Sequence, residues 1–161
     1  MNNNHDGLIL RFEQIPKTTP KKNYLIVCDN IENLVSHNLL RSRMDMFSLK
    51  QSDFLKPTVL IKKLRKINRK NIGIEIKISD LRKSTSQDVG KWIRFIDEIY
   101  KFCKLSDCQI IFSSGASSQY ETISSTTFNS ILKICNIKSN HYWKDLEQWL
   151  DLKTKVYEYD I

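Results

Sequence analysis

The sequence predicts an α/β protein with mainly parallel strands, and three observations support this class. Short β-prone runs alternate with longer segments whose apolar residues recur at helical spacing, which is the rhythm of βαβ units. The run 24–28 is continuously β-prone, as expected of a strand that is covered on both faces. The chain has 161 residues and 40% hydrophobic content, which suffices for one domain with a real core.

The N-terminal part is predicted to contain strands at 8–12, 24–28 and 44–49. The loop between the first two strands carries prolines, which cannot continue a β-ladder. Before the third strand, Asn30 is predicted to cap a short helix, because apolar residues recur at helical spacing over 31–39.

The middle of the chain has the most regular pattern. Pro57 is a favourable first helical residue, and the apolar residues after it share one face: Leu60, Ile61, Leu64 and Ile67. A strand over 72–78 and a polar turn over 79–82 come next. From Asp88 a long helix is predicted by the apolar stripe of Val89, Trp92, Ile93, Ile96, Ile99, Tyr100 and Cys103. A further strand ends at Phe112.

The C-terminal part is predicted to be helical. Ser125 or Thr126 can cap one helix, and Ser139 or Asn140 can cap another. The alternating segment 156–159 reads as an edge strand or a tail.

Five predicted strands are fewer than the eight of a closed (β/α) barrel, so the expected fold is an incomplete or open TIM-barrel-like (β/α) fold. Its unpaired edge must be covered, either by a partner or by the C-terminal segment. We expect residues 1–161 to form a single barrel-like domain, with 1–6 and 153–161 as flexible or tail-like ends.

The charge predicts a polyanionic partner. Lys and Arg number 26 against 18 Asp and Glu, which gives a net charge of +8 and favours nucleic acid first and an anionic membrane surface second. The start lacks a signal-peptide pattern and no apolar run is long enough to span a bilayer, so we expect a cytoplasmic protein that does not enter a membrane.

The cations are concentrated in one segment. No acid occurs between Phe54 and Ile74, whereas this stretch contains Lys56, Lys62, Lys63, Arg65, Lys66, Arg69 and Lys70. Such a run is usually a solvated helix face, but cations without acids at i,i+4 favour binding to backbone phosphates. Lys17, Lys21 and Lys22 follow one strand and Arg82 and Lys83 follow another. The predicted RNA-binding residues are Lys62, Lys63, Arg65, Lys66, Arg69, Arg82 and Lys83.

We assign no catalytic residue and no metal ligand. Glu75 lies in mid-strand, where it is either a buried structural carboxylate or a catalytic base, and Asp29, Asp45 and Asp80 near strand ends keep the catalytic alternative open. The histidines are far apart and the cysteines lack metal-ligand spacing, so we interpret the cysteines as reduced and structural.

Two other features have two readings each. Ser113, Ser114 and Gly115 follow a strand and can shape a turn or hold a phosphate, with Gly115 free to take a positive φ. Four aromatic residues near the end of the sequence can stack on unpaired bases: Tyr142, Trp143, Trp149 and Tyr157. The helical spacing of Trp143 and Trp149 favours core packing instead.

The segment 71–137 resembles one family. The strand containing Glu75-Ile76, the turn Ser79-Asp80-Leu81, a helix, and a strand closing on Ser113-Ser114-Gly115-Ala116 are similar to the signature of archaeal ribonuclease P protein component 3, the counterpart of the eukaryotic 30-kilodalton subunit. The similarity extends from Leu8 to about Ile137. The arginines that the family carries after this turn are absent, because the chain reads Thr122-Ile123-Ser124 after Glu121.

The resemblance implies a non-catalytic subunit of ribonuclease P, which removes 5′ leaders from precursor tRNA. It implies that the RNA subunit performs the hydrolysis with its own Mg²⁺, that the protein binds no cofactor, and that precursor tRNA is met only indirectly. The implied partners are the ribonuclease P RNA and the small ferredoxin-like protein subunit. A metal-dependent phosphoesterase of related barrel fold and a generic RNA-binding assembly protein remain as alternatives.

Overall fold

A computed structural model describes residues 9–12, 25–29, 44–50, 53, 56–67 and 71–155. One sheet contains five strands, all neighbours are parallel, and the strands lie in sequence order. The predicted α/β class with parallel strands is confirmed. The strands are β1 (Ile9–Phe12), β2 (Leu25–Cys28), β3 (Met46–Ser48), β4 (Gly73–Lys77) and β5 (Gln109–Ser113).

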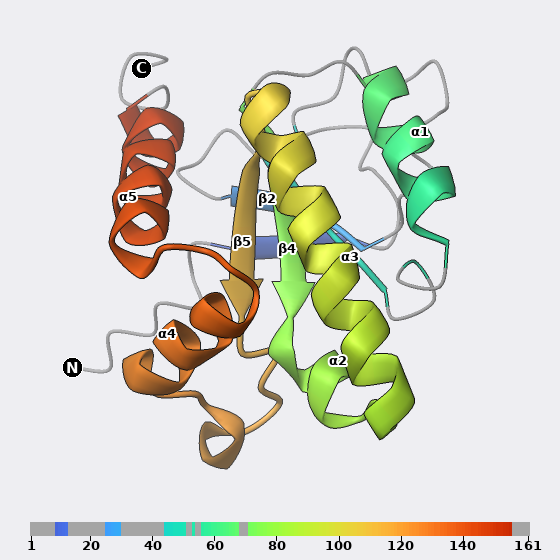
Figure 1. Cartoon of the computed structure of the whole chain (residues 1–161). Coiled ribbons are helices and arrows are strands. Elements are labelled where there is room, and N and C mark those ends of the chain that lie inside the picture. The colour runs from blue at the N-terminus through green and yellow to red at the C-terminus, as the bar shows by residue number, and fades with distance from the viewer. Residues whose placement is uncertain are drawn as a thin grey trace, which may run out of the picture.

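Helices connect and cover these strands. Parallel neighbours cannot be joined by a hairpin, so each connection must cross over the sheet, and α1 and α3 lie in two such connections. Both helices cover the same face of the sheet (Figure 1). The helices are α1 (Pro57–Ile67), α2 (Ile78–Arg82), α3 (Ser86–Leu105), the 3₁₀ turn η5 (Gln119–Glu121), α4 (Ser125–Ile134) and α5 (Ser139–Lys155).

Several predicted boundaries were wrong by a few residues. The predicted polar turn after β4 is the short helix α2, and Ile78 belongs to that helix and not to the strand. The N-cap of α4 is Ser124, whose hydroxyl accepts the backbone N–H of Thr127 at 3.2 Å, one residue before the predicted caps. Adjacent Ser and Thr residues have similar capping chemistry, so composition alone does not select among them.

The predicted ends are only partly described. Helix α5 continues to Lys155, so residues 153–155 are helical and not a tail. Residues 1–6, the predicted helix at 31–39 and the segment 156–159 lie outside the described residues.

The main core lies between the sheet and the helices on its covered face. The apolar stripe of α3 was predicted in part, because Trp92, Ile96, Ile99 and Cys103 are buried. Val89, Ile93 and Tyr100 are only partly buried, and the buried Phe95 and Phe102 were not in the predicted stripe. On β4 and β5, alternate residues face the same core, as the two-residue period of a strand requires. The central residues of this core are Trp92, Phe95, Ile96, Ile99, Ile74, Ile76, Ile110 and Phe112.

The other face of the sheet has a smaller core that the C-terminal helix completes. Trp149 of α5 packs with Leu25, Val27 and Met46, and its Nε1 donates a hydrogen bond to the carbonyl oxygen of Asn71 at 2.8 Å. Trp149 thus reaches across the amino ends of the strands from the β5 side.

Helix α5 also covers the edge of β5 that does not pair with β4. The backbone N–H of Phe112 points away from β4 and donates to the hydroxyl of Tyr142 at 2.9 Å, and the two rings are 5.6 Å apart between centroids. Figure 1 shows α5 beside β5 along this edge. Of the two expected ways to cover the edge, the C-terminal segment is the one observed at β5.

Candidate nucleic-acid interface

Helix α1 presents an exposed row of cations. Leu60 and Leu64 are buried against the core, so the amphipathic helix must direct its charged residues outward. Lys62, Arg65 and Lys66 are exposed and share one side of the helix at i, i+3 and i+4 spacing. Within the described part of the chain, these three residues form no ion pair.

The other predicted cations are placed differently. Lys63 is only half exposed and interacts with another residue, so it is not equivalent to its neighbours on α1. Arg82 is the last residue of α2, Lys83 follows it, and both are exposed. Arg69 lies outside the described residues, as do Lys17, Lys21 and Lys22.

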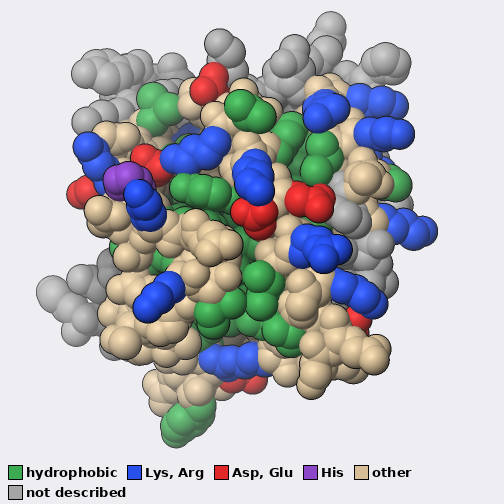
Figure 2. All heavy atoms as spheres, viewed as in Figure 1, with side chains coloured by type: hydrophobic (Ala, Val, Ile, Leu, Met, Phe, Trp, Pro, Cys, Tyr) green, Lys and Arg blue, Asp and Glu red, His purple; other side chains and the backbone are tan. Residues whose placement is uncertain are grey.

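The structure separates the predicted cations into two areas. Helix α1 connects the carboxyl end of β3 to the amino end of β4, so its last turn, with Arg65 and Lys66, lies toward the amino ends of the strands. Arg82 and Lys83 follow the carboxyl end of β4. Figure 2 shows Lys and Arg side chains spread over this helix-covered face, with few acids among them on the α1 side.

Helix α3 adds cations that the sequence analysis did not assign. Three of them are neutralised by nearby acids, because Lys91 lies 3.4 Å from Asp88, Lys101 lies 2.6 Å from Asp97, and Lys104 pairs with Asp145 of α5. The first two pairs follow from i,i+3 and i,i+4 spacing, whereas the third joins residues far apart in sequence. The contrast makes the unpaired cations of α1 the stronger phosphate-binding candidates.

The turn after β5 is fixed against α2. The backbone N–H of Ser79 donates to the carbonyl oxygen of Ser114 at 3.0 Å, and Gly115 has the predicted positive φ, at 62°. A Cβ on Gly115 would lie 2.3 Å from Ser79 Oγ and 3.0 Å from Lys77 Cβ. This position therefore requires glycine both for its backbone conformation and for the close approach.

Several donors of this turn already have partners in the chain. The N–H of Ala116 donates to Ser114 Oγ, and the N–H and the hydroxyl of Ser117 both donate to Glu121 Oε2 at 2.8 Å. These bonds from Ser117, with smaller contributions from Lys83 and Arg82, hold the pKa of Glu121 below its ordinary value. The carboxylate of Glu121 thus already accepts hydrogen bonds from donors that a bound phosphate would need. This favours a structural role in shaping the turn over phosphate binding.

We expect Gly115→Ala to lower the free energy of unfolding by about 1–3 kcal/mol, because alanine disfavours this φ and its methyl group would displace Ser79. Chemical denaturation measures the change. Gly90→Ala is the matched control, because Gly90 is exposed in mid-helix with nothing near its Cβ position. That control should gain about 0.5–1 kcal/mol. Equal stabilities of the two variants would contradict the requirement for glycine at 115.

The acidic residues that kept the catalytic alternative open are placed differently: Glu75 and Asp80 interact electrostatically, and Asp29 and Asp80 both interact with Lys77. Glu75 is 1% exposed in β4, while the side chain of Asp45, the residue before β3, accepts the N–H of Ile26 at 2.9 Å. Asp29 lies 3.6 Å from Lys77. Among the described residues, no three His, Cys, Asp or Glu side chains are arranged to hold a metal ion.

Among these acids, Asp80 has the environment most typical of a functional carboxyl group. It is half-buried, and this burial raises the pKa of its carboxyl group against the opposing charges of Lys77 and Lys83, with Glu75 adding to the rise. The cysteines instead agree with the structural reading: burial raises the pKa of Cys108 to about 11 and that of Cys135 to about 12. Such thiols stay protonated at neutral pH.

The C-terminal aromatic residues are mostly core residues. Trp149 is buried, as its spacing predicted. Trp143, for which the same packing was predicted, is instead exposed and donates through Nε1 to Asn129, and Tyr142, whose spacing predicted nothing, is buried. Tyr157 lies outside the described residues. Tyr120, which is 90% exposed in η5, was not predicted as a site residue. Its position in a Ser-rich loop without apolar periodicity was the available signal.

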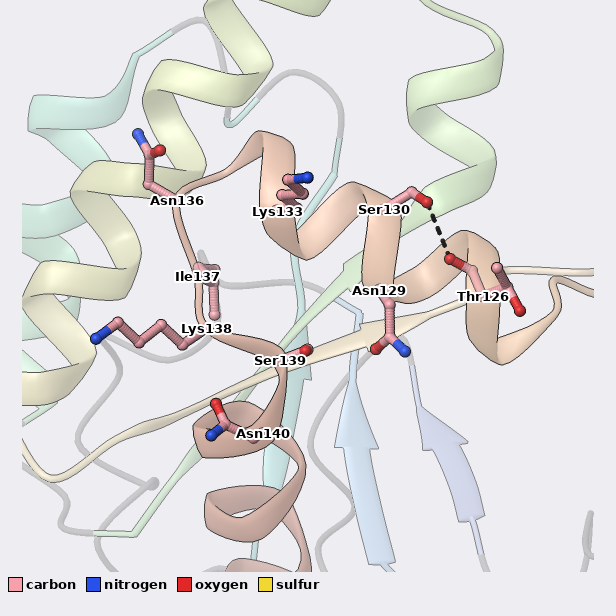
Figure 3. A pocket seen from close by; sticks show the side chains of 9 residues that line it. All are labelled: Thr126, Asn129, Ser130, Lys133, Asn136, Ile137, Lys138, Ser139 and Asn140. Atoms are coloured by element: carbon pink, nitrogen blue, oxygen red, sulfur yellow. Dashed lines mark hydrogen bonds between the residues drawn. The ribbon is translucent and has the colours of Figure 1, made fainter.

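An open groove of about 610 Å³ lies between the end of α4 and the start of α5. Lys133 and Lys138 add positive charge to its rim, but its polar side chains fan out and do not converge on one point (Figure 3). The hydroxyl of Ser130 is already bonded to the carbonyl oxygen of Thr126. We therefore assign this groove no ligand.

The described residues define an α/β protein with a parallel sheet, a helix-covered face and an unpaired basic row on α1. Comparisons with known protein families and with curated proteins gave no match. No helix in the described ranges is both long and apolar enough to cross a membrane.

Proposed function

We propose that the protein is a non-catalytic, RNA-binding subunit of ribonuclease P. The observation that carries this proposal is the exposed, acid-free row of Lys62, Arg65 and Lys66 on a chain of net charge +8. Unpaired cations on a rigid helix suit contacts to phosphates, which position an RNA without reading its sequence. The resemblance of the segment 71–137 to archaeal ribonuclease P protein component 3 supports ribonuclease P RNA as the RNA that is bound.

We further propose that the sheet is part of an incomplete or open TIM-barrel-like fold. Strands in sequence order support this, because doubly wound sheets reverse their strand order and place helices on both faces. Helices α1 and α3 cover the same face of the sheet (Figure 1), as in a barrel, where all helices lie on the outer face of the sheet. In this arrangement Trp149 closes the inner face near the amino ends of the strands.

In the proposed complex the RNA subunit performs the hydrolysis with its own Mg²⁺, and the protein contributes cations. Each cation near a phosphate lowers the repulsion that opposes folding and docking of two polyanions. The small ferredoxin-like protein subunit is the proposed protein partner. Asp45 has a structural role, because its side chain accepts the N–H of Ile26, whereas Glu75 and Asp80 lie near enough to interact electrostatically and keep phosphoesterase chemistry as the alternative.

Reconstitution of the holoenzyme with and without this subunit tests the proposal. We expect the full chain to lower the Mg²⁺ concentration needed for cleavage of precursor tRNA, because protein cations replace part of the metal's charge screening. Cleavage that is identical at low Mg²⁺ with and without the chain would reject the proposal. RNA binding without an effect on cleavage would leave the generic assembly protein as the better description, and hydrolysis by the purified chain alone would indicate the phosphoesterase.

A further inference from the structure

The ring of Tyr120 is exposed to solvent and is not part of the core. It is 90% exposed, the largest exposure among the large hydrophobic residues of the described segments. A ring held in water contributes almost no burial energy, so folding does not explain the position of this ring, and its faces are open to a ligand. Figure 2 shows a hydrophobic protrusion at the lower end of the molecule, where Figure 1 places the segment between β5 and α4.

The turn that carries Tyr120 is held by its own hydrogen bonds. Glu121 Oε2 accepts from both the N–H and the hydroxyl of Ser117 at 2.8 Å, and the hydroxyl of Thr122 donates to the carbonyl oxygen of Gln119 at 2.7 Å. These bonds bracket Tyr120 on both sides. Because the backbone beneath the ring is already fixed, a ligand that stacks on the ring does not have to order the turn, which lowers the entropic cost of that contact.

Two cations lie at the base of the same turn. The chain before η5 is fixed to α2 through the bond from Ser79 to Ser114, and α2 ends one helical turn later at Arg82. Both Arg82 and Lys83 are near enough to act electrostatically on Glu121, the neighbour of Tyr120. Exposed aromatic and cationic side chains are therefore brought together at one end of the molecule.

The surroundings favour a nucleobase over a protein partner. Protein interfaces need a contiguous apolar centre, but the exposed neighbours of Tyr120 are small and polar: Ser117, Ser118, Gln119, Thr122, Ser124 and Ser125. The nearest apolar residue in sequence, Ile123, is partly buried against the main core. A lone ring beside cations suits stacking on one base, with the adjacent phosphates held by charge.

We propose that Tyr120 stacks on an unpaired base of the RNA, while Arg82 and Lys83 contact the phosphates beside that base. This inference rests on the proposed RNA-binding function and deepens it, because it names an unpaired nucleotide as the element bound at the carboxyl ends of β4 and β5. Stacking on a ring accepts any base, so the contact selects unpaired over paired RNA without selecting a sequence.

The test compares an unstructured oligouridylate with an RNA duplex of the same length, each bound to the full chain. We expect Tyr120→Ala to weaken binding of the single strand by roughly 10- to 100-fold and binding of the duplex far less, and Tyr120→Trp to restore the single-strand affinity. Leu105→Ala is the matched control, because Leu105 is 88% exposed at the end of α3, and it should change neither affinity.

The outcomes separate this inference from the function on which it rests. If the parent chain binds both RNAs and Tyr120→Ala binds the single strand equally well, the stacking contact is overturned while RNA binding stands. A variant that keeps its RNA affinity but loses affinity for the ferredoxin-like subunit would make the ring a protein contact, which also overturns it. If the folded parent chain binds no RNA, including ribonuclease P RNA, the proposed function itself fails.

Discussion

Replacing Trp149 by alanine is expected to lower the free energy of unfolding by about 3–5 kcal/mol, the usual cost of removing a buried tryptophan. Trp149 is 5% exposed and is the buried residue that α5 contributes to the small core formed with Leu25, Val27 and Met46, against which the partly buried Leu146 of α5 also packs. Gly73 accommodates its ring, because a Cβ there would lie 2.9 Å from Trp149 Cζ2. Alanine would leave a cavity under the sheet and detach the end of α5.

Urea denaturation of the full chain measures this loss, and Trp143→Ala is a control on the same helix. Trp143 is 37% exposed, so its removal should cost less, about 1–2 kcal/mol. Trp149→Phe should fall between the two, because it keeps most of the ring but leaves the carbonyl oxygen of Asn71 without its indole donor. Equal losses for Trp149→Ala and Trp143→Ala would show that α5 does not complete this core.

The combined change Lys62→Ala, Arg65→Ala and Lys66→Ala is expected to have the largest effect on RNA binding. If each cation contacts one phosphate, the slope of log affinity against log salt should become shallower by about 2–3, which corresponds to a loss on the order of 100-fold at about 0.1 M salt. Folding should persist, because all three side chains are exposed and alanine is the best helix former.

A variant of equal charge tests whether the location matters. Lys91→Ala, Lys101→Ala and Lys104→Ala together also remove three cations, but these cations are paired with Asp88, Asp97 and Asp145. This control also frees three acids, which would repel any RNA lying over α3, so an unchanged salt slope would show that the RNA does not lie there. We expect its salt slope to change by less than about one. The same slope change in both triple variants would attribute binding to net charge and not to α1.

Local patterns were enough to predict the strands and the covered helices of the described segments. The stripe of α3 appears in the sequence because a helix that packs on a sheet must repeat apolar residues every three to four positions. The strands at 25–28 and 73–77 were equally visible from their β-prone runs. The boundaries at Ser124 and Ile78 were not, because neighbouring residues offer the same caps and the same β-propensity.

The placement of α5 depended on contacts that no local pattern contains. A helix with Tyr142 and Trp149 on one side must bury that side, but its spacing does not say which surface it meets. The backbone N–H of Phe112 at the β5 edge and the space above Gly73 determine that surface, and both are in place only after the sheet has formed.

The sequence by itself determined the number of cations, the acid-free segment that holds many of them, and the α/β class, because charge and periodicity are properties of the chain. Only the tertiary structure decided which cations are neutralised and which are not. Lys104 meets Asp145 because α3 and α5 are neighbours in space, whereas α1 faces no acid that could pair with Lys62, Arg65 or Lys66 among the described residues. Likewise, folding buries Trp149 and leaves Tyr120 in water, since the burial of an aromatic ring depends on what packs against it.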